Sequence, residues 1–384
     1  MEAQVKFSPR KRVLNHLREG IANGIYPVGQ PLPSERDLAQ SVGVARMTVR
    51  SVLLALDEQG IVHSNGGRLR LVSEQAEPIQ EVGAVQVLKN TLVLVSINPE
   101  GSASHHKEHG WSDRIDHGVL IEARKHRLHH LTFEPSRLIG NDWEHLLAAQ
   151  PHGVIITDLL DEGGDALQRA VTWRERGLAV VAYGNAPDSQ ELDRVSSDHE
   201  AGGYLLTQAL LEMGRKSIVM IAPAEAGIYW FDERYAGYCR AHQERGLVPS
   251  NPVPVSTMPS VENLKQGFEL KYRLLAGYLA PLFSSSKVDA IIALSDGQVA
   301  PLSAACRALG KAPNKDIVIA GYDDFWSETL ERTMDNEAPM FSIDKRNGVI
   351  GAELVRLLEE RVSGQLPPAA QKRLVKPVLR RRVR

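Results

Sequence analysis

Residues Pro33–Arg50, with the sequence PSERDLAQSVGVARMTVR, constrain the fold of this chain more than any other stretch. Ser34 is placed to cap a short helix, because Asp37 completes a capping-box pattern three residues later. Gly43 separates this helix from a second one. The second helix carries Val49, Val52, Leu53 and Leu56 on one face, whereas Arg46, Thr48 and Arg50 stand at its start, largely off that face. Two short helices joined by a glycine turn, the second led by basic residues, predict a helix-turn-helix that places its second helix in the major groove of DNA.

The flanking residues extend this pattern to a winged helix. Apolar residues at helical spacing predict a preceding helix over Lys11–Ile21. Ile61–His63 and Arg68–Val72 indicate two short strands. Asn65, Gly66 and Gly67 between them favour a hairpin turn, because these residue types accept positive φ.

Residues 8–73 resemble the GntR family, which has a PSER-type start, a recognition helix of the TVR type and a glycine-rich wing. The resemblance implies contacts with DNA. An isolated exposed arginine would suggest only a solvated helix face, but three arginines here fall on the positions that the family uses for DNA. The residues expected at the DNA are Ser34, Arg36, Arg46, Met47, Thr48, Arg50, Asn65, Gly66 and Gly67.

Two positions depart from the GntR pattern. Ala45 has no side-chain oxygen to cap the recognition helix or to touch a phosphate, and the missing cap costs about 1 kcal/mol. Met47 replaces a common polar residue and offers an apolar contact in place of a hydrogen bond. Neither change removes the arginines.

Length and charge limit the remainder of the chain. With 384 residues, 43% of them hydrophobic, the sequence allows about two or three folded domains. Residues 1–75 hold ten Lys or Arg against seven Asp or Glu, and residues 372–384 hold seven basic residues and no acidic one. The residues between them therefore carry the excess of negative charge. A basic head and an acidic body suit a module that approaches phosphates and a sensor that does not.

The sequence lacks the marks of several other protein classes. Its two cysteines, Cys239 and Cys306, have no CxxC spacing, which fits a reducing cytosol and argues against a zinc site. Because no apolar run resembles a signal peptide or a membrane span, we expect a cytoplasmic protein without membrane contact. There is no GxGxxG, P-loop, GxSxG or HExxH motif, so we expect neither an enzyme nor a cofactor.

The chain beyond the head reads as a linker followed by an α/β body. Residues 74–90 have mixed charge and weak periodicity, which indicates a linker. From Thr91 onward, short apolar strands such as Leu92–Ile97 alternate with amphipathic helices such as Ile115–Lys125, and this happens in two comparable sets. The predicted fold class is therefore α/β: a winged helix-turn-helix (α+β) N-terminal domain plus a two-lobed α/β domain over residues 91–384, with a cleft between its lobes.

This second region resembles the LacI/GalR family. The segment Val195–Gly203, the RYAGY element that begins at Arg234, the strand that ends at Asp296 and the element Lys315–Asp324 occur in the family's order. The resemblance runs from about residue 92 to residue 384 and implies the periplasmic-binding-protein-like type I fold, which binds small ligands, most often sugars. A GntR-type head on a LacI-type sensor is known from bacterial arabinose-responsive repressors.

The resemblance and the chemistry of sugars select candidate effector ligands. Charged planar groups hold sugar hydroxyls, and aromatic rings cover their C–H faces. Arg234 and Asp296 stand at positions that the family uses for ligand, although they could instead form a structural ion pair. Each aromatic candidate could equally pack in a core, and Asp323 and Asp324 indicate a capped turn. The candidate set is Arg234, Asp296, Tyr183, Trp230, Phe231 and Trp326.

One histidine-rich segment, with His105, His106 and His109, raises the question of a metal site. No cysteine or carboxylate stands at ligand spacing, so we interpret the segment as a cleft loop and expect no metal.

Together these features favour a ligand-responsive transcriptional regulator, in particular a repressor. It would bind double-stranded operator DNA and a small sugar-like effector, and it would act as a homodimer. A solute-binding protein of a transport system is the alternative, but it explains only the sensor. The chain is expected to pass between the lobes near Asp188–Asp193, Phe341–Lys345 and Leu366–Lys372, which would give a hinge.

Overall fold

The computed structural model describes residues 9–22, 25–58, 60–64, 70–73, 88–96, 110–133, 146, 148–157, 165–256, 263–285 and 288–382. The chain divides into two compact units, Met1–Gln86 and Val87–Arg384, called here the head and the sensor. Most of the expected linker lies outside the described residues. So do the wing residues Asn65, Gly66 and Gly67 and the histidines His105, His106 and His109.

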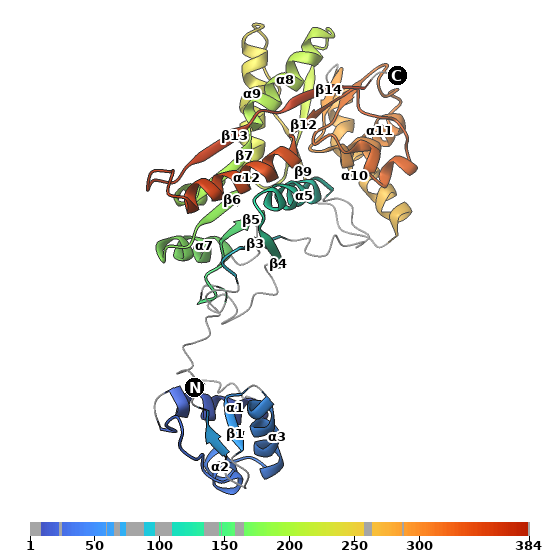
Figure 1. The fold of residues 1–384 in the computed structure, drawn as a ribbon. Coiled ribbons are helices and arrows are strands. Elements are labelled where there is room, and N and C mark those ends of the chain that lie inside the picture. Colours follow the sequence, from blue (N-terminus) through green and yellow to red (C-terminus); the bar gives the residue numbers. More distant parts are fainter. Residues whose placement is uncertain are drawn as a thin grey trace. The chain divides into compact units, whose positions relative to one another are not determined.

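The head has the three helices and the hairpin that the sequence predicts (Figure 1). Its elements are α1 (Pro9–Ala22), α2 (Glu35–Val42), α3 (Arg46–Glu58), β1 (Val62–Ser64) and β2 (Arg70–Val72). The two strands are antiparallel, with Val62 opposite Val72. Each element contributes apolar side chains to one core, which holds Val13, Leu17, Leu38, Val49, Val52, Leu53, Leu56, Val62 and Val72. The four apolar residues that the sequence predicts on one face of the second helix therefore form the buried face of α3.

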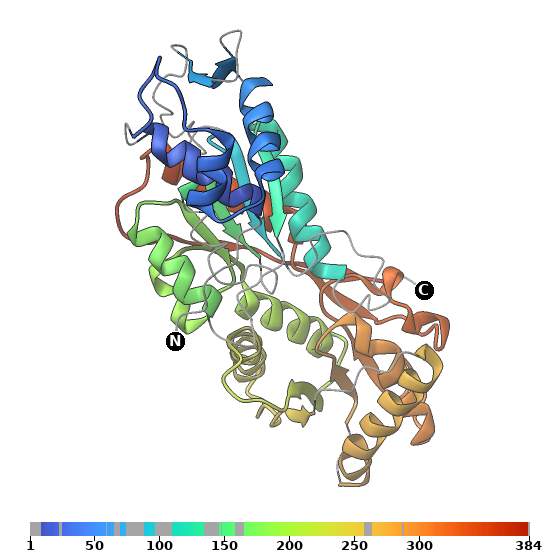
Figure 2. The same ribbon diagram turned by 90° about the horizontal axis from the view of Figure 1, so that it is seen from below.

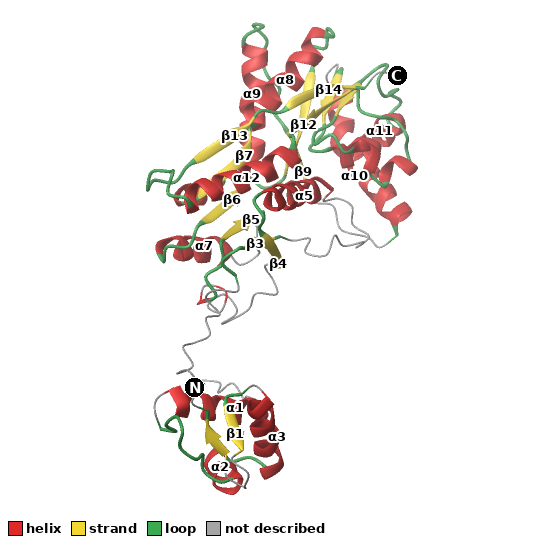
Figure 3. Ribbon diagram, in the orientation of Figure 1, coloured by secondary structure: helices red, strands yellow, loops and turns green. Residues whose placement is uncertain are grey.

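The described residues of the sensor form two six-stranded sheets, each with helices on both faces (Figure 3). The first sheet, in the order β13-β7-β6-β5-β3-β4, is parallel throughout and belongs to the first lobe. The lobe comprises β3 (Thr91–Val95), α5 (Gly110–Lys125), β4 (His129–Phe133), β5 (Gly153–Ile156), α7 (Asp165–Glu175), β6 (Val180–Tyr183), β7 (Asp193–Ser197), α12 (Asn347–Val362) and β13 (Lys372–Val375).

Burial on both faces explains why the first-lobe strands are apolar at successive positions. In β3, Leu92 and Leu94 pack with side chains of α5 and α12, whereas Val93 and Val95 pack with side chains of α7 on the opposite face. A parallel strand covered on two sides has no solvent-facing position, so its sequence does not alternate.

The second lobe is built around the order β14-β12-β11-β10-β8-β9, in which only β14 runs antiparallel to its neighbour. Helices α8 and α9 cover one face, and α10 and α11 cover the other. The lobe comprises α8 (His199–Glu212), β8 (Ile218–Pro223), α9 (Tyr229–Gln243), β9 (Val253–Val255), α10 (Leu264–Ser285), β10 (Ala290–Ile292), α11 (Val299–Ala308), β11 (Val318–Ala320), β12 (Phe341–Asp344) and β14 (Val378–Arg381). In Figures 1 and 2, α7 of the first lobe and α10 of the second lie at opposite ends of the sensor.

Three short connections join the two lobes, and two of them differ from the sequence prediction. The first is Asp198, between β7 and α8, rather than Asp188–Asp193, because β7 still pairs with β6 in the first sheet. The second, Lys345–Arg346, agrees with the expected place. The third is Lys376–Pro377 rather than Leu366–Lys372, because β13 pairs with β7 before the chain enters β14. In the described part of the chain, no helix has both the length and the apolar character to cross a membrane.

Candidate functional site

The helix-turn-helix begins with the predicted cap. Ser34 Oγ accepts a hydrogen bond from the backbone N–H of Asp37 (3.2 Å) and donates one to the Asp37 carboxylate (2.7 Å). Gly43 ends α2 with φ of +67°, a left-handed conformation in which a side chain would be strained. These two features define the start and the end of α2.

The two arginines at the start of α3 share one carboxylate, that of Glu35. Arg46 Nε lies 3.2 Å from Glu35 Oε2, and Arg50 donates from Nε to Oε1 (3.1 Å) and from Nη2 to Oε2 (3.0 Å). Hydrogen bonding from Arg50 is the main cause that lowers the pKa of Glu35. Both arginines stay exposed, so their remaining N–H groups face solvent. Sequence reasoning did not select Glu35, although it stands inside the motif that was read.

The other expected DNA-contacting residues of the motif also lie on the surface of the head. The Arg36 side chain is 85% exposed, and Met47 is 68% exposed. A methionine with that exposure gains little from packing inside the head, which suits an apolar contact with a partner. Thr48 is half-buried on α3.

In the sensor, a buried cluster of charged residues gathers around Arg234 of α9. Asp323 follows β11, Lys345 follows β12, and His199 is the first residue of α8. Lys345 Nζ lies 2.9 Å from Asp323 Oδ1, and Arg234 Nη2 lies 4.0 Å from the same oxygen. We call Arg234, Asp323, Lys345, His199 and Tyr322 the Arg234 cluster.

Further contacts hold the Arg234 guanidinium in place. It donates from Nη1 to the Leu294 carbonyl (2.9 Å) and from Nε to His199 Nδ1 (3.5 Å). Its central carbon lies 3.5 Å from the centre of the Tyr322 ring and 4.6 Å from that of Trp230. Burial, followed by the charges of Arg234 and Lys345, lowers the pKa of His199 well below its usual value. Burial is also the main cause that lowers the pKa of Lys345.

The cluster lies beside the seam between the two lobes. Asn185, just after β6 of the first lobe, donates to Glu233 of α9 (2.7 Å). Tyr229 of α9 approaches Gly184 so closely that a Cβ there would lie 2.8 Å from the Tyr229 hydroxyl. His199 and Tyr229 form an edge-to-face ring contact, with centroids 6.2 Å apart. A small molecule held between the lobes here would meet side chains of both.

Arg234 and Asp296 do not form the structural ion pair that the sequence left open as the alternative to ligand binding, because the Asp296 carboxyl group bonds elsewhere. Its Oδ2 accepts hydrogen bonds from the backbone N–H groups of Phe325 (3.0 Å) and Trp326 (2.9 Å). Its Oδ1 accepts one from the Ser342 hydroxyl (2.8 Å). The carboxyl group is fully buried, which raises its pKa to about 7. Asp296 therefore fixes the turn after β11, and Asp323 stands beside Arg234 instead.

The four aromatic candidates divide into two pairs. Phe231 and Trp326 are buried in the hydrophobic cores on the two faces of the second-lobe sheet. Trp230 is half-buried and stacks on Arg234, while Tyr183 is half-buried at the end of β6. The expectation that Asp323 and Asp324 belong to a turn agrees with their positive φ values of 86° and 51°.

The sequence offered one signal for the members of the cluster that were missed. Asp323, Lys345 and His199 each follow the carboxyl end of a parallel strand by one to three residues. Ligands of α/β sheets bind at these ends. Because these residues are buried beside apolar strands, no polar stretch of sequence marks them. Only their position after a strand does. In the described residues, no group of His, Cys, Asp and Glu side chains is arranged to hold a metal ion.

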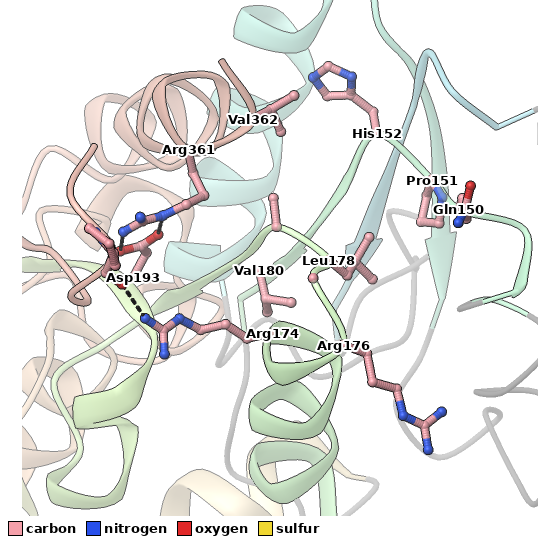
Figure 4. A pocket seen from close by; sticks show the side chains of 13 residues that line it. Gln150, Pro151, His152, Arg174, Arg176, Leu178, Val180, Asp193, Arg361 and Val362 are labelled. Atoms are coloured by element: carbon pink, nitrogen blue, oxygen red, sulfur yellow. Dashed lines mark hydrogen bonds and ion pairs between the residues drawn. The ribbon is translucent and has the colours of Figure 1, made fainter. Parts of the chain in front are cut away.

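A separate pocket of about 610 Å³ opens at the amino ends of β5 and β6, away from the Arg234 cluster (Figure 4). Several of its polar side chains are already paired. Arg361 binds the Asp193 carboxylate, Arg174 donates to the Pro368 carbonyl (2.8 Å), and His152 contacts Glu359. None of the predicted effector residues lines it.

Comparison with known families divides the chain as its structure does. Residues 9–69 match the family of bacterial regulatory proteins, gntR family. Residues 106–363 match the family of periplasmic binding proteins and sugar binding domain of LacI family.

Individual relatives are similar over different parts of the chain. The HTH-type transcriptional regulator CelR of Thermobifida fusca is 29% identical over 198 residues, which are 50% of this chain and 52% of CelR, so the match spans about half of that relative. The arabinose metabolism transcriptional repressor of Halalkalibacterium halodurans is 22% identical over 84% of this chain and 81% of its own. A solved structure of a CelR–cellobiose complex covers 91% of this chain and 98% of its own, at 23% identity and a TM-score of 0.57, and shares the fold.

Proposed function

The chain belongs to the family of periplasmic binding proteins and sugar binding domain of LacI family and carries a gntR-type head, and on this premise we propose that it is a ligand-responsive transcriptional repressor. The observation that carries the proposal is the combination of an exposed, arginine-led recognition helix with a two-lobed sensor. The CelR regulator and the arabinose repressor, to which the chain is similar, support this assignment. A transport solute-binding protein would have no use for the head.

We assign residues 8–73 to DNA binding, residues 74–90 to the linker and residues 91–384 to sensing and dimerisation. The base-reading residues are Arg46 and Arg50, with Arg36 on the DNA backbone and the wing in the minor groove. A homodimer would present two heads to a two-fold operator. The protein would work in the cytoplasm as a regulator, without an enzymatic step.

For the effector we propose a sugar-like molecule between the lobes. It would contact Arg234, Asp323, Trp230 and Tyr183, which gather at the seam. Asp296, Phe231 and Trp326 would support the site without touching the effector, because their polar atoms or rings are used within the lobe.

Genomic fragment selection followed by footprinting tests the DNA-binding half of the proposal. The full-length protein should retain a small set of related, two-fold-symmetric sequences. Addition of one member of a sugar panel should then release the retained duplex. A protein that retains no duplex above the level of random DNA would contradict the assignment.

A further inference from the structure

The face of α3 that points away from the core of the head carries two exposed apolar side chains. Met47 is 68% exposed and Leu54 is 48% exposed. With about 3.6 residues per turn, both lie on the side of the helix opposite its four buried apolar residues. The outward side of a surface helix is ordinarily polar, so apolar side chains at this place are available to a partner.

Two arginines flank this face of α3. Arg46 and Arg50 lie beside it, where the carboxylate of Glu35 binds both. Their side chains are 64% and 46% exposed. Met47 and Arg50 are three residues apart, which makes them neighbours on the helix surface. Positive charge beside an apolar side chain on a recognition helix fits the major groove, because phosphates border that groove.

The major groove offers an apolar side chain one kind of partner. The base edges present hydrogen-bond donors and acceptors there, and the apolar group among them is the C5-methyl of thymine. Methionine has no N–H or O–H group to donate, and its flexible, polarisable chain adapts to an apolar contact. Residues near the start of a recognition helix reach the base edges. Met47 is the second residue of α3, whereas Leu54 lies about two turns further along.

We propose that Met47 is a specificity-determining residue that reads a pyrimidine C5-methyl group in the operator, beside a base pair contacted by Arg46 or Arg50. The inference rests on the proposed function and adds a base preference to it. The methyl group belongs to thymine or to 5-methylcytosine, since both carry it on the same ring carbon. A base pair without that group leaves the Met47 side chain against polar edges.

A scan of thymine-to-uracil substitutions tests the proposal, because uracil differs from thymine only by the missing methyl group. The probe is the duplex that the full-length protein retains most strongly from a randomised library. Each thymine of one half-site is replaced in turn, and fluorescence anisotropy gives the dissociation constant. At one thymine, loss of the methyl group should weaken binding about fourfold, the equivalent of about 0.8 kcal/mol for one buried methyl-sized group.

A second set of duplexes distinguishes the two sources of the methyl group. The sensitive T·A pair is replaced by C·G and by 5-methylcytosine·G. Tighter binding of the methylated cytosine, again by about fourfold, would show that Met47 reads either base. Equal binding of the two cytosine duplexes would confine the contact to thymine.

Variants of Met47 assign the contact to this side chain. Met47→Gln has nearly the same length but is polar, and it should bind the thymine and uracil duplexes equally. Met47→Leu stays apolar and should keep most of the preference. Met334→Ala is the matched control, because Met334 is an exposed methionine of the sensor (42%), and it should keep the whole preference. Since Met47 is exposed, its substitution removes no core contact of the head.

The outcomes separate this inference from the proposed function. A wild type that retains a specific duplex but tolerates every thymine-to-uracil change would refute the methyl contact and keep the repressor. A preference that survives in Met47→Gln would belong to another residue and would also refute it. If Met47→Gln alters the oligomeric state while the wild type binds both duplexes alike, the face serves a second copy of the chain and the inference is wrong. A protein that retains no duplex above random DNA would contradict the proposed function itself.

Discussion

Asp296 is buried with its carboxyl group at a pKa of about 7, and this makes the stability of the sensor depend on pH. In the unfolded chain the group titrates near 3.8, so between these values the folded state binds a proton that the unfolded state has lost. The free energy of unfolding therefore falls as pH rises through this window, by about 1.4 kcal/mol per pH unit from this group.

Asp296→Asn should remove that dependence, because its Oδ1 can accept from the two backbone N–H groups and its Nδ2 can donate to Ser342. We expect the free energy of unfolding of the variant, relative to the wild type, to rise steadily from pH 4 to about pH 7. Denaturant unfolding at a series of pH values measures it. A constant difference across the series would mean that the carboxyl group is ionised when folded.

Arg46 carries a second prediction for a single side chain. A bidentate arginine–guanine pair discriminates by about 1–3 kcal/mol, so Arg46→Ala should lose operator preference while effector binding is unchanged. Arg46→Lys keeps the charge but not the planar fork, and it should retain affinity for random DNA while losing the preference. The exposed Arg332→Ala in the sensor is the matched control. Fluorescence anisotropy with operator and random duplexes decides between these outcomes.

Helix α2 depends on its cap, since α2 has only eight residues. Ser34→Ala removes the acceptor for the Asp37 N–H and also the hydrogen bond that the Ser34 hydroxyl donates to the Asp37 carboxylate. The variant should destabilise the head by about 1 kcal/mol. Ser34→Asp should restore most of this. Ser41→Ala in the same helix, whose hydroxyl only donates back to the Leu38 carbonyl, should be nearly neutral. Denaturant unfolding of the full-length protein measures the difference, as the change in the free energy of the transition that belongs to the head. Equal effects at Ser34 and Ser41 would exclude a capping role.

Helices α8 and α9 approach each other through glycines, and this contact supports the Arg234 cluster. A Cβ at Gly203 would lie 2.0 Å from the backbone oxygen of Arg234. Gly203→Ala must push α9 away and should cost several kcal/mol, with weaker effector binding. Gly277→Ala in α10 is the matched control, because nothing lies within 4 Å of its new Cβ and alanine favours a helix by up to about 1 kcal/mol. Gly203→Ala should lower the unfolding temperature and weaken effector binding. Gly277→Ala should keep or slightly raise the unfolding temperature and leave effector binding unchanged. Thermal unfolding and effector titration measure the two effects.

The elements of this protein were easier to predict than its contacts. The apolar spacing of α3 and the continuous apolar run of β3 depend on local sequence, so both were read correctly. Two of the three lobe connections were misplaced, because strand pairing decides where the chain leaves a lobe. The sequences of β7 and β13 do not show that both strands pair within the first sheet. Asp296 and Asp323 both follow strands, and only the fold shows that Asp296 bonds to the turn while Asp323 lies beside Arg234.

The three connections between the lobes give the sensor a way to move as two bodies. Asp198, Lys345–Arg346 and Lys376–Pro377 are each one or two residues long, so the seam can bend while resisting twist. One of them contains Lys345, a member of the Arg234 cluster. An effector held at the Arg234 cluster would therefore lie against a connection, and it would favour the lobe arrangement in which its contacts are complete.

Coupling between this movement and DNA must be reciprocal. If the effector relieves repression, the arrangement that binds operator is the one that binds effector less well, with a typical coupling of about 1–3 kcal/mol. Operator duplex must then weaken effector binding by the same factor by which effector weakens operator binding. Calorimetric titration of effector with and without saturating operator measures it, and Arg46→Ala, which cannot recognise operator, should show no difference. Equal dissociation constants for the wild type would mean that the sensor does not control the head, whereas tighter effector binding on DNA would make the effector a co-repressor.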